Sequence, residues 1–412
     1  MLSFMQYVEA KEEAIPVRMK SPMEVPEPIR RIHRAFRDRG KHLFVVGGAV
    51  RDHLLGKTPK DYDLSTNAAP EEVMVVLDSH GIDRTKDSVG NQFGVVIAKI
   101  DNEPYEIATF RKDLEAKRQT KVQFSSIQDD AARRDLTINA LYYDLDAQEV
   151  VDYVGGIEDL RAGRVRTVGD PSQRFGEDAL RVLRYLRFLA RVQANGYEHI
   201  DEETKAAILE RVENGLKSDN GEPVASERIR DEFIKGFKTA VSSSGYLQSY
   251  AAFGLLTRYV FPGLNVSEER PDSRNYILVI GHLLKNNDPE KIKRRLIELT
   301  YTNDEVNKIV YLVHLINLQQ GHLGNQLKDR PQYLYALKRA EQEVSDEELD
   351  TWANWHKLDP QVLKSFRAYQ LKNRQDVPGA ADLQGPEIGK LITKHNTEEM
   401  MRQMGFKEWL TS

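Results

Sequence analysis

The chain has 412 residues, 40% of them hydrophobic and 30% charged, with a formal net charge of −5, and this length predicts about two to four globular domains. The acidic balance excludes a basic field over the whole molecule, so any binding of nucleic acid must come from a local surface. Cysteine is absent, which excludes disulfides and thiolate sites, and no apolar run is long enough to span a membrane, so we expect a cytoplasmic protein without membrane attachment.

Residues 1–28 mix charges with prolines and show little periodicity, so they are predicted to form an irregular arm. A helix is expected over residues 27–40. The apolar run Leu43–Val46, which ends at a glycine pair, is short enough to be a buried strand packed beside that helix.

Gly47 and Gly48 stand between this strand and a short predicted helix, where free backbone N–H groups favour an anion, usually a phosphate. Arg51, one turn into the helix, can add a guanidinium fork to the same phosphate. Asp61 and Asp63 follow in an apolar-alternating segment, and a strand turns residues i and i+2 to one face. Two carboxylates beside a polyphosphate favour Mg²⁺. Taken alone, the glycine pair would be interpreted as an ordinary turn, and the acid pair as a solvated strand edge or a turn. Because the two pairs follow each other within 20 residues, the phosphate site is the favoured interpretation.

The segments GGAVRDHLLG and PKDYDLST also resemble the first signature of the class II, bacterial-type family of tRNA nucleotidyltransferases and poly(A) polymerases. The resemblance implies that Asp61 and Asp63 are catalytic and hold two Mg²⁺ ions. It also implies that Gly48 and Arg51 hold a nucleotide triphosphate.

After residue 66, Pro70 and two glutamates begin a predicted helix, and the segments NQFGVVIAKI and PYEIATF are predicted strands. Helices and strands therefore alternate around a small mixed sheet, which predicts an α/β head domain. Within the second strand, Glu106 is either a solvent-facing residue or a third catalytic carboxylate beside the acid pair; the resemblance favours the carboxylate because the family carries an acid here.

Residues 111–124, RKDLEAKRQTKVQF, are highly charged and have no apolar stripe, so they are predicted to form a mobile loop that acts as a lid. The resemblance implies that this loop helps the change from adding C to adding A. Residues 129–141 resemble the second signature, RRDxTINAL. Arg134 is a candidate for triphosphate or ribose contact, and Asp135 and Asn139 are candidates for bonding sugar hydroxyls. An exposed helix face is the plainer interpretation of the two arginines.

Residues 174–191, RFGEDALRVLRYLRFLAR, are predicted to form one helix with a buried face. Asp178, Arg181, Arg184 and Arg187 recur every three residues and follow another side of it. In isolation this pattern is typical of a solvated amphipathic helix. Here the segment resembles the family's nucleobase-reading signature, EDxLRxLRxxRF, at each defined position.

The residue types suit base selection. Asp178 can accept from the exocyclic amino group of cytosine or adenine, and Arg181 can donate to the adjacent ring nitrogen. Uracil and guanine present a carbonyl there, and an unmatched buried polar contact costs about 1–3 kcal/mol. Arg184 and Arg187 are expected to neutralise the triphosphate or to hold Asp178.

The remaining chain is helical in pattern and has no catalytic motif. Two basic clusters are either solvated helix faces or RNA-backbone contacts; their members are Lys291, Lys293, Arg294 and Arg295, and Lys328, Arg330, Lys338 and Arg339. Gly385 and Pro386 precede a short predicted helix that could hold an RNA phosphate. The predicted class is α+β, with an irregular arm (1–28), a nucleotidyltransferase head (29–160), and an all-helical neck (161–240), body (241–330) and tail (331–412).

The resemblance, strong over residues 40–240, implies CCA addition: a tRNA 3′-hydroxyl attacks CTP, CTP and then ATP in turn. The nearest rival function is that of a poly(A) polymerase, which typically carries a basic GRRF-like segment where this chain has DSVGNQFGVV. Two further possibilities are an enzyme that adds only CC or only A, and a catalytically silent RNA-binding protein built on the same fold.

Overall fold

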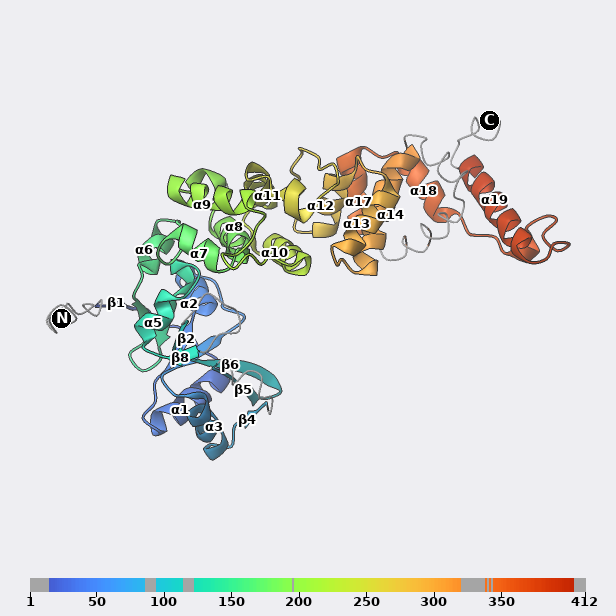
Figure 1. Ribbon diagram of the computed structural model, residues 1–412. Coiled ribbons are helices and arrows are strands. Elements are labelled where there is room, and N and C mark those ends of the chain that lie inside the picture. The colour runs from blue at the N-terminus through green and yellow to red at the C-terminus, as the bar shows by residue number, and fades with distance from the viewer. Residues whose placement is uncertain are drawn as a thin grey trace. The chain divides into compact units, whose positions relative to one another are not determined.

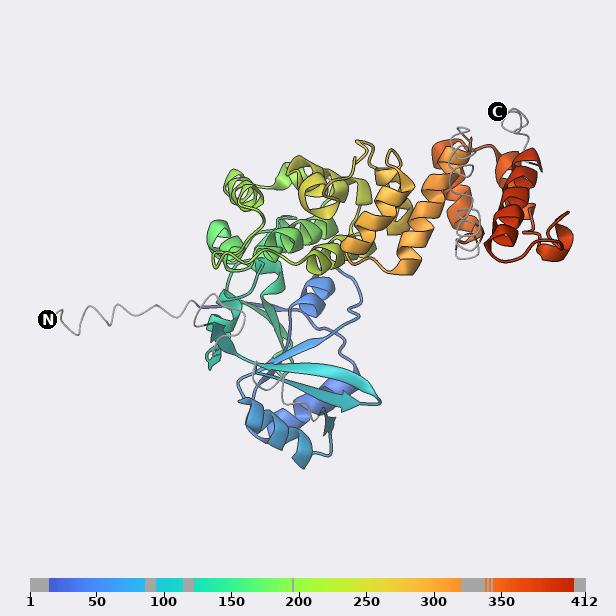
Figure 2. The same ribbon diagram turned by 45° about the vertical axis from the view of Figure 1, so that its right-hand side comes forward.

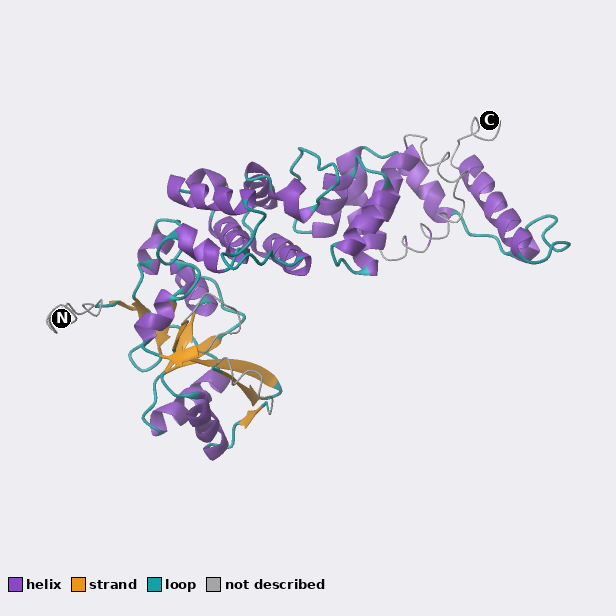
Figure 3. Cartoon of the chain, in the orientation of Figure 1, coloured by secondary structure: helices purple, strands orange, loops and turns teal. Residues whose placement is uncertain are grey.

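The structure is a computed structural model that describes residues 15–85, 94–113, 122–194, 196–319, 338, 341 and 344–403. The chain forms two compact units, Met1–Val224 and Ala225–Ser412. The first unit holds a mixed sheet with helices, and every element described in the second unit is a helix or a loop, as Figure 3 shows. The predicted α+β class with an N-terminal sheet domain is therefore confirmed.

The main sheet has eight strands in the order β1-β10-β9-β2-β3-β6-β5-β4. All of its neighbouring pairs are antiparallel except β3 and β6, which run parallel, so the sheet is mixed as predicted. Its strands are β1 (Val17–Lys20), β2 (Leu43–Val46), β3 (Asp63–Thr66), β4 (Asp83–Arg84), β5 (Val95–Ile100), β6 (Glu103–Thr109), β9 (Leu141–Asp144) and β10 (Glu149–Asp152).

Helices α1 (Glu27–Asp38) and α3 (Pro70–Ser79) pack together against the sheet, side by side in Figures 1 and 2. The interpretation of residues 27–40 as a helix beside the first predicted strand is confirmed. Val46, Phe110 and Tyr142 form a separate core cluster together with Ala131 of α5 (Ile127–Ala132). Because strand residues alternate between faces, this cluster fixes which way the side chains at the end of β2 point.

The prediction of an irregular arm is wrong for four of its residues. Val17–Lys20 forms β1, an edge strand paired with β10, while residues 1–14 lie outside the described residues. An edge strand needs only one partner strand, and this one buries no side chain fully, so it leaves no alternating apolar pattern in the sequence.

The predicted loop 111–124 is also different at its ends. Strands β7 (Arg111–Asp113) and β8 (Val122–Phe124) pair antiparallel as a two-stranded sheet, while the middle of the predicted lid, residues 114–121, lies outside the described residues. Backbone pairing needs no apolar side chain, so charge composition alone did not predict it.

The predicted single helix over residues 174–191 is in fact two helices, α7 (Pro171–Glu177) and α8 (Leu180–Val192). Asp178 lies between them in an extended conformation, with φ −149° and ψ 106°, and its Oδ1 accepts from the backbone N–H of Leu180. Such capping competes with helix continuation. The buried face predicted from helical spacing is confirmed, since all of its members are buried: Ala179, just before α8, and Val182, Leu183, Leu186 and Ala190 within it.

The other helices of the first unit are α2 (Gly48–Leu54), η1 (Thr137–Asn139), α6 (Gly156–Arg161), η2 (Gly196–His199) and α9 (Glu202–Glu213). The second unit contains α10 (Ser226–Thr239), α11 (Ser243–Ala252), η3 (Leu256–Val260), α12 (Tyr276–Leu284), α13 (Pro289–Glu298), α14 (Asn303–Gln319), α17 (Asp346–His356), α18 (Pro360–Ala368), η4 (Arg374–Asp376) and α19 (Pro386–Gln403). No described helix is long and apolar enough to cross a membrane.

Within the second unit, Trp352 is fully buried and anchors the core. The helix that begins at Pro386 is longer than expected, with 18 residues. The division between the units, at residues 224 and 225, places α10 with the following helices, whereas it was predicted to lie in the neck. The finer division into neck, body and tail stays a prediction.

Candidate active site

The glycine turn and the acid pair meet at one edge of the sheet. Val46, the last residue of β2, is the register partner of Asp63, the first residue of β3. Gly47 then adopts a φ of +73°, a conformation that favours glycine, and its N–H bonds the carbonyl of Leu141. Gly48 begins α2 directly after this turn. The expected closeness of the glycine turn and Asp63 is therefore confirmed.

Asp61 and Asp63 do not both stand on the strand, as the pattern predicted, because Asp61 belongs to the preceding loop. Both line a cavity of 1110 Å³, together with Glu106. The β3–β6 register pairs Leu64 with Ile107, so Asp63 and Glu106 occupy the preceding positions of two neighbouring strands, on the same face. The structure thus brings all three predicted carboxylates to one cavity.

A divalent cation fits the character of this acid pair. Partial burial raises the pKa of Asp63, Arg134 opposes the rise, and the nearby Asp61 carboxylate adds to it. A cation placed between two such carboxylates would relieve their repulsion, and oxygen ligands suit Mg²⁺. No set of three acidic or histidine side chains is gathered closely enough for a metal in the described part of the chain, so the role of Glu106 as a third catalytic carboxylate stays a prediction.

Arg134 faces the glycine turn. Its Nη2 donates to Asp130 at 3.1 Å and its Nε to the hydroxyl of Tyr142 at 3.1 Å, while that hydroxyl donates to Asp130 at 2.6 Å. A Cβ atom added at Gly47 would stand 3.7 Å from Nη1 of Arg134. Since Arg134 also acts electrostatically on Asp63, one fixed cation serves both the turn and the acid pair.

Arg51, the predicted phosphate ligand, is buried and bonded to other side chains in the structure. The residue is only 3% exposed, and its side chain donates to Asn139 and, from Nε and Nη2, to Asp52. Burial, aided by Arg191 nearby, lowers the pKa of Arg51 to about 10, so it stays charged at neutral pH. In this conformation it ties α2 to η1, and its contact with a phosphate stays a prediction.

Asp135 joins the second predicted signature to α8. Its Oδ2 accepts from Arg184, and its Oδ1 accepts from the amide of Asn139 at 3.3 Å. Burial alone would raise the pKa of Asp135, but Arg184 and the hydrogen bonds from Asn139 and the Leu136 N–H lower it overall. Asp135, Asn139 and Arg184 were predicted from separate segments, and the structure brings them into one network with Arg51.

The predicted base-reading pair has other protein partners. Arg181 is held by Glu177, and its Nη1 also donates to the carbonyl of Arg174 at 3.2 Å. Asp178 caps the start of α8, and neither residue is among those that line the cavity of the acid pair. Both are half-buried, and their assignment to the base stays a prediction.

Phe188 holds these parts together and was not predicted to do so. Its ring has guanidinium carbons of Arg51, Arg184 and Arg187 at 5.0, 5.8 and 4.2 Å from its centroid. Cation–π contacts of this kind favour positive charge over an aromatic face. Phe188 is one of the defined positions of EDxLRxLRxxRF, so its aromatic type was a signal that could have been followed.

Asp52 and Arg191 form a second contact that was not predicted. Nη2 of Arg191 donates to Oδ2 of Asp52 at 2.6 Å, while Oδ1 of Asp52 accepts from Arg51. One carboxylate thereby bridges an arginine of α2 and an arginine of α8. Both residues stand inside the quoted motifs, but nothing local indicates that they pair with each other.

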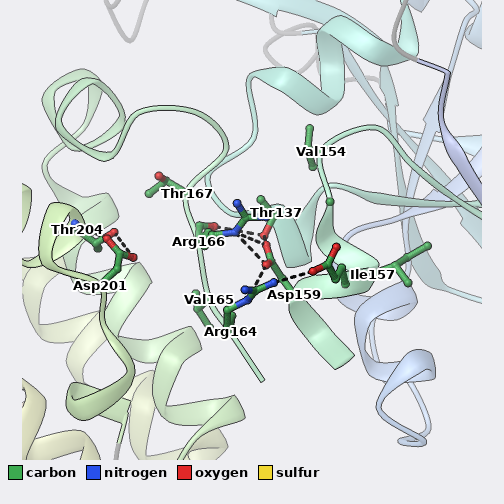
Figure 4. Close-up of polar contacts among 12 residues, drawn as sticks. Thr137, Val154, Ile157, Asp159, Arg164, Val165, Arg166, Thr167, Asp201 and Thr204 are labelled. Carbon is green, nitrogen blue, oxygen red and sulfur yellow. Dashed lines mark hydrogen bonds and ion pairs between the residues drawn. The ribbon is translucent and has the colours of Figure 1, made fainter. Parts of the chain in front are cut away.

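A buried carboxylate braces the segment that carries Asp135 and Asn139 (Figure 4). Asp159 is fully buried on α6 and accepts from the hydroxyl of Thr137 at 2.7 Å and from Nε of Arg166 at 2.9 Å to each oxygen. Arg164 adds an ion pair at 3.4 Å. No local pattern points to this role of Asp159, which lies 22 residues from Thr137.

Comparison with known proteins identifies relatives of this arrangement. Residues 43–166 match the family described as the poly(A) polymerase head domain. A CCA-adding enzyme of Leuconostoc mesenteroides is 34% identical over 294 residues, 67% of this chain and 68% of that protein. Poly(A) polymerase I of Salmonella typhimurium is 34% identical over 269 residues, 60% of this chain and 53% of the other. The chain spans about half the length of the first curated relatives it matches.

A solved structure supports the fold over nearly the whole chain. The CCA-adding enzyme of Bacillus stearothermophilus, crystallised in complex with CTP, is 23% identical with a TM-score of 0.59, and the match covers 94% of this chain and 99% of that one. At this identity the likeness concerns the fold, which agrees with a sheet-containing head followed by a helical remainder.

Proposed function

Because the chain belongs to the class II family of tRNA nucleotidyltransferases and poly(A) polymerases, we propose that it is a CCA-adding enzyme. It attaches C, C and A to the 3′ end of a tRNA, using CTP and ATP and releasing pyrophosphate, without a nucleic-acid template. The observation that carries the proposal is the register of Val46 and Asp63, which sets a glycine turn beside an acid pair. A cytoplasmic location stays a prediction.

The acid pair would hold the catalytic metal. Asp61 and Asp63 offer the oxygen ligands that Mg²⁺ prefers, and bound Mg²⁺ supplies charge that activates the attacking hydroxyl and offsets the negative leaving group. The protein's own cations support the same chemistry, since Arg134 faces the glycine turn and acts on Asp63. The backbone N–H of Gly48, where α2 begins beside the acid pair, is the proposed donor to a phosphate.

The choice of base is assigned to Asp178 and Arg181, supported by their match to EDxLRxLRxxRF. Glu177 holds the guanidinium of Arg181, and the backbone N–H of Leu180 holds the carboxylate of Asp178. These partners restrict the rotamers of both side chains, which favours a fixed donor–acceptor pattern. Asp135 and Asn139 stay the proposed ribose contacts, and Arg184 and Arg187 the cations that neutralise the triphosphate.

A poly(A) polymerase is the second candidate, supported by the Salmonella typhimurium relative. The sequence DSVGNQFGVV, which lacks the basic GRRF-like segment, favours CCA addition. Incubating the protein with a tRNA that lacks its last three residues, then sequencing the new 3′ end, decides between them. Addition of C, C and A supports the proposal. Addition of a run of adenosines to RNA without tRNA structure supports the poly(A) polymerase. Addition of only CC or only A supports an enzyme that completes part of the sequence.

A further inference from the structure

The four basic residues on α13, which are Lys291, Lys293, Arg294 and Arg295, have different surroundings in the structure. Arg295 Nε donates to the carbonyl of Pro262 at 2.7 Å, and its Nη1 bonds Glu298. Arg295 is therefore a structural residue that holds the loop 262–264 against the helix. Lys293 is exposed and does not line the groove between this helix and the loop.

Lys291 and Arg294 line this groove, which has a volume of 310 Å³. They are three residues apart on a helix, so their side chains leave the same face. Both are exposed, and within the described part of the chain neither side chain makes a hydrogen bond or an ion pair. The groove therefore presents two uncompensated cations side by side.

The wall opposite these cations is fixed in place. Gly263 has a φ of +82°, and the next segment is clamped by Asn287, which accepts from the N–H of Asn265 at 2.8 Å and donates to its carbonyl at 2.7 Å. The remaining charges on this helix face, those of Arg295 and Glu298, pair with each other. Two free cations beside a fixed loop suit a phosphate, because a small anion can accept hydrogen bonds from both side chains at once.

We propose that Lys291 and Arg294 form a seat for a backbone phosphate of the RNA substrate, on the second unit of the chain. The inference rests on the proposed function, because it takes a tRNA as the substrate. The net charge of −5 means that the whole molecule does not attract RNA, so local seats of this kind must supply the attraction. Because every nucleotide carries the same phosphate, this contact would position the RNA without selecting its base sequence.

The size of the effect follows from counterion release. Each phosphate contact makes affinity vary with salt concentration to a power of about −0.7 to −0.9, which is a factor of about five to eight at 0.1 M salt. If the two cations share one phosphate, removing both should weaken tRNA binding about five- to eightfold at 0.1 M salt and reduce the slope of log affinity against log salt by about 0.7–0.9.

The chain offers a matched control for the test. Lys291→Gln and Lys293→Gln remove the same charge from the same helix, two residues apart, but only Lys291 lines the groove. Binding of a tRNA without its last three residues is measured from 0.05 to 0.3 M salt for the full-length wild type, K291Q, R294Q, K291Q/R294Q and K293Q. Circular dichroism checks that each variant is folded.

We expect a weaker affinity and a shallower salt slope for K291Q, R294Q and the double variant, with K293Q like the wild type. Equal losses in K291Q and K293Q, or no loss in the double variant, would overturn the phosphate seat. The function is tested separately by extension of the same tRNA by the wild type. If the wild type extends the tRNA normally and K291Q/R294Q binds it with unchanged affinity, only the phosphate seat is excluded. If the wild type does not extend the tRNA, the proposed function is excluded.

Discussion

Arg184 donates two hydrogen bonds to a single carboxylate oxygen of Asp135, from Nε at 2.9 Å and from Nη2 at 2.6 Å. The two residues are 49 apart in the sequence and come from different predicted signatures. Their pairing ties the proposed base-reading helix α8 to the segment that carries the proposed ribose contacts. A nucleotide bound at α8 and this segment would meet side chains that are already oriented. This lowers the entropy cost of ordering those side chains on binding.

The pair predicts a pH dependence of stability. Because the folded-state pKa of Asp135 lies below its usual value, its contribution to the free energy of unfolding is complete above the unfolded pKa of about 4 and is lost as pH falls through the folded pKa. Arg184→Gln removes the main cause of the lowering and leaves burial, which raises the pKa. Thermal unfolding between pH 3 and 7 should show the R184Q variant losing stability at a higher pH than the wild type. Parallel curves would contradict this origin of the pKa shift.

Asp61→Ala or Asp63→Ala should reduce nucleotide incorporation by about a thousandfold or more, since a catalytic metal supplies several kcal/mol of charge stabilisation. Binding of tRNA should be almost unchanged, because neither carboxylate attracts a phosphate. Incorporation is measured with radiolabelled CTP and affinity by filter binding. Glu103→Gln, a change in the same cavity at a residue outside the acid pair, serves as the control. Near-normal turnover in D61A would remove the metal assignment.

Arg181→Ala should relax the choice of nucleotide. If Arg181 donates to cytosine and adenine, its loss costs about 1–3 kcal/mol of discrimination, or roughly 5- to 150-fold in the ratio of kcat/KM for CTP to that for UTP. Glu177→Gln should cause a smaller loss, because it frees the guanidinium that the carboxylate holds but leaves it in place. An unchanged CTP to UTP ratio in R181A would exclude the templating role.

Local patterns predicted the site better than they predicted the sheet. The strand Leu43–Val46, the glycine turn and the helix after Pro70 all depend on a few adjacent residues, and all three are present. The strands β9 and β10 were not predicted, although they pair with each other as a local hairpin. Their places beside β2 and β1 join residues about a hundred or more apart, which no local pattern indicates. The break at Asp178 was missed because helical spacing of apolar residues continues across it. The spacing of apolar residues carries no information about a carboxylate that caps the next helix, as Asp178 does.

Asp52 and Arg191 should be energetically coupled, since their hydrogen bond of 2.6 Å spans 139 residues and joins α2 to α8. Both side chains are mostly buried, so losing one partner leaves the charge of the other less compensated. Asp52 would keep its hydrogen bonds from Arg51, whereas Arg191 would lose this carboxylate. In a double-mutant cycle, D52N and R191Q should each destabilise the protein, and the double variant should cost less than their sum by about 0.5–3 kcal/mol. Urea unfolding of the four proteins measures this, and strict additivity would show that the contact contributes nothing.

Asp159→Ala should destabilise the first unit by about 1–3 kcal/mol, because the buried hydroxyl of Thr137 loses its acceptor while Arg166, half exposed, regains water. Since Thr137 lies two residues before Asn139 in η1, the loss should also weaken nucleotide binding and raise KM for CTP more than it lowers kcat. Arg166→Ala removes a partner of the same carboxylate from the solvent side and should cost less. Urea unfolding followed in the first unit, with KM measured for each variant, separates the two effects. If D159A has the same free energy of unfolding and the same KM for CTP as the wild type, the buried carboxylate does not brace the site.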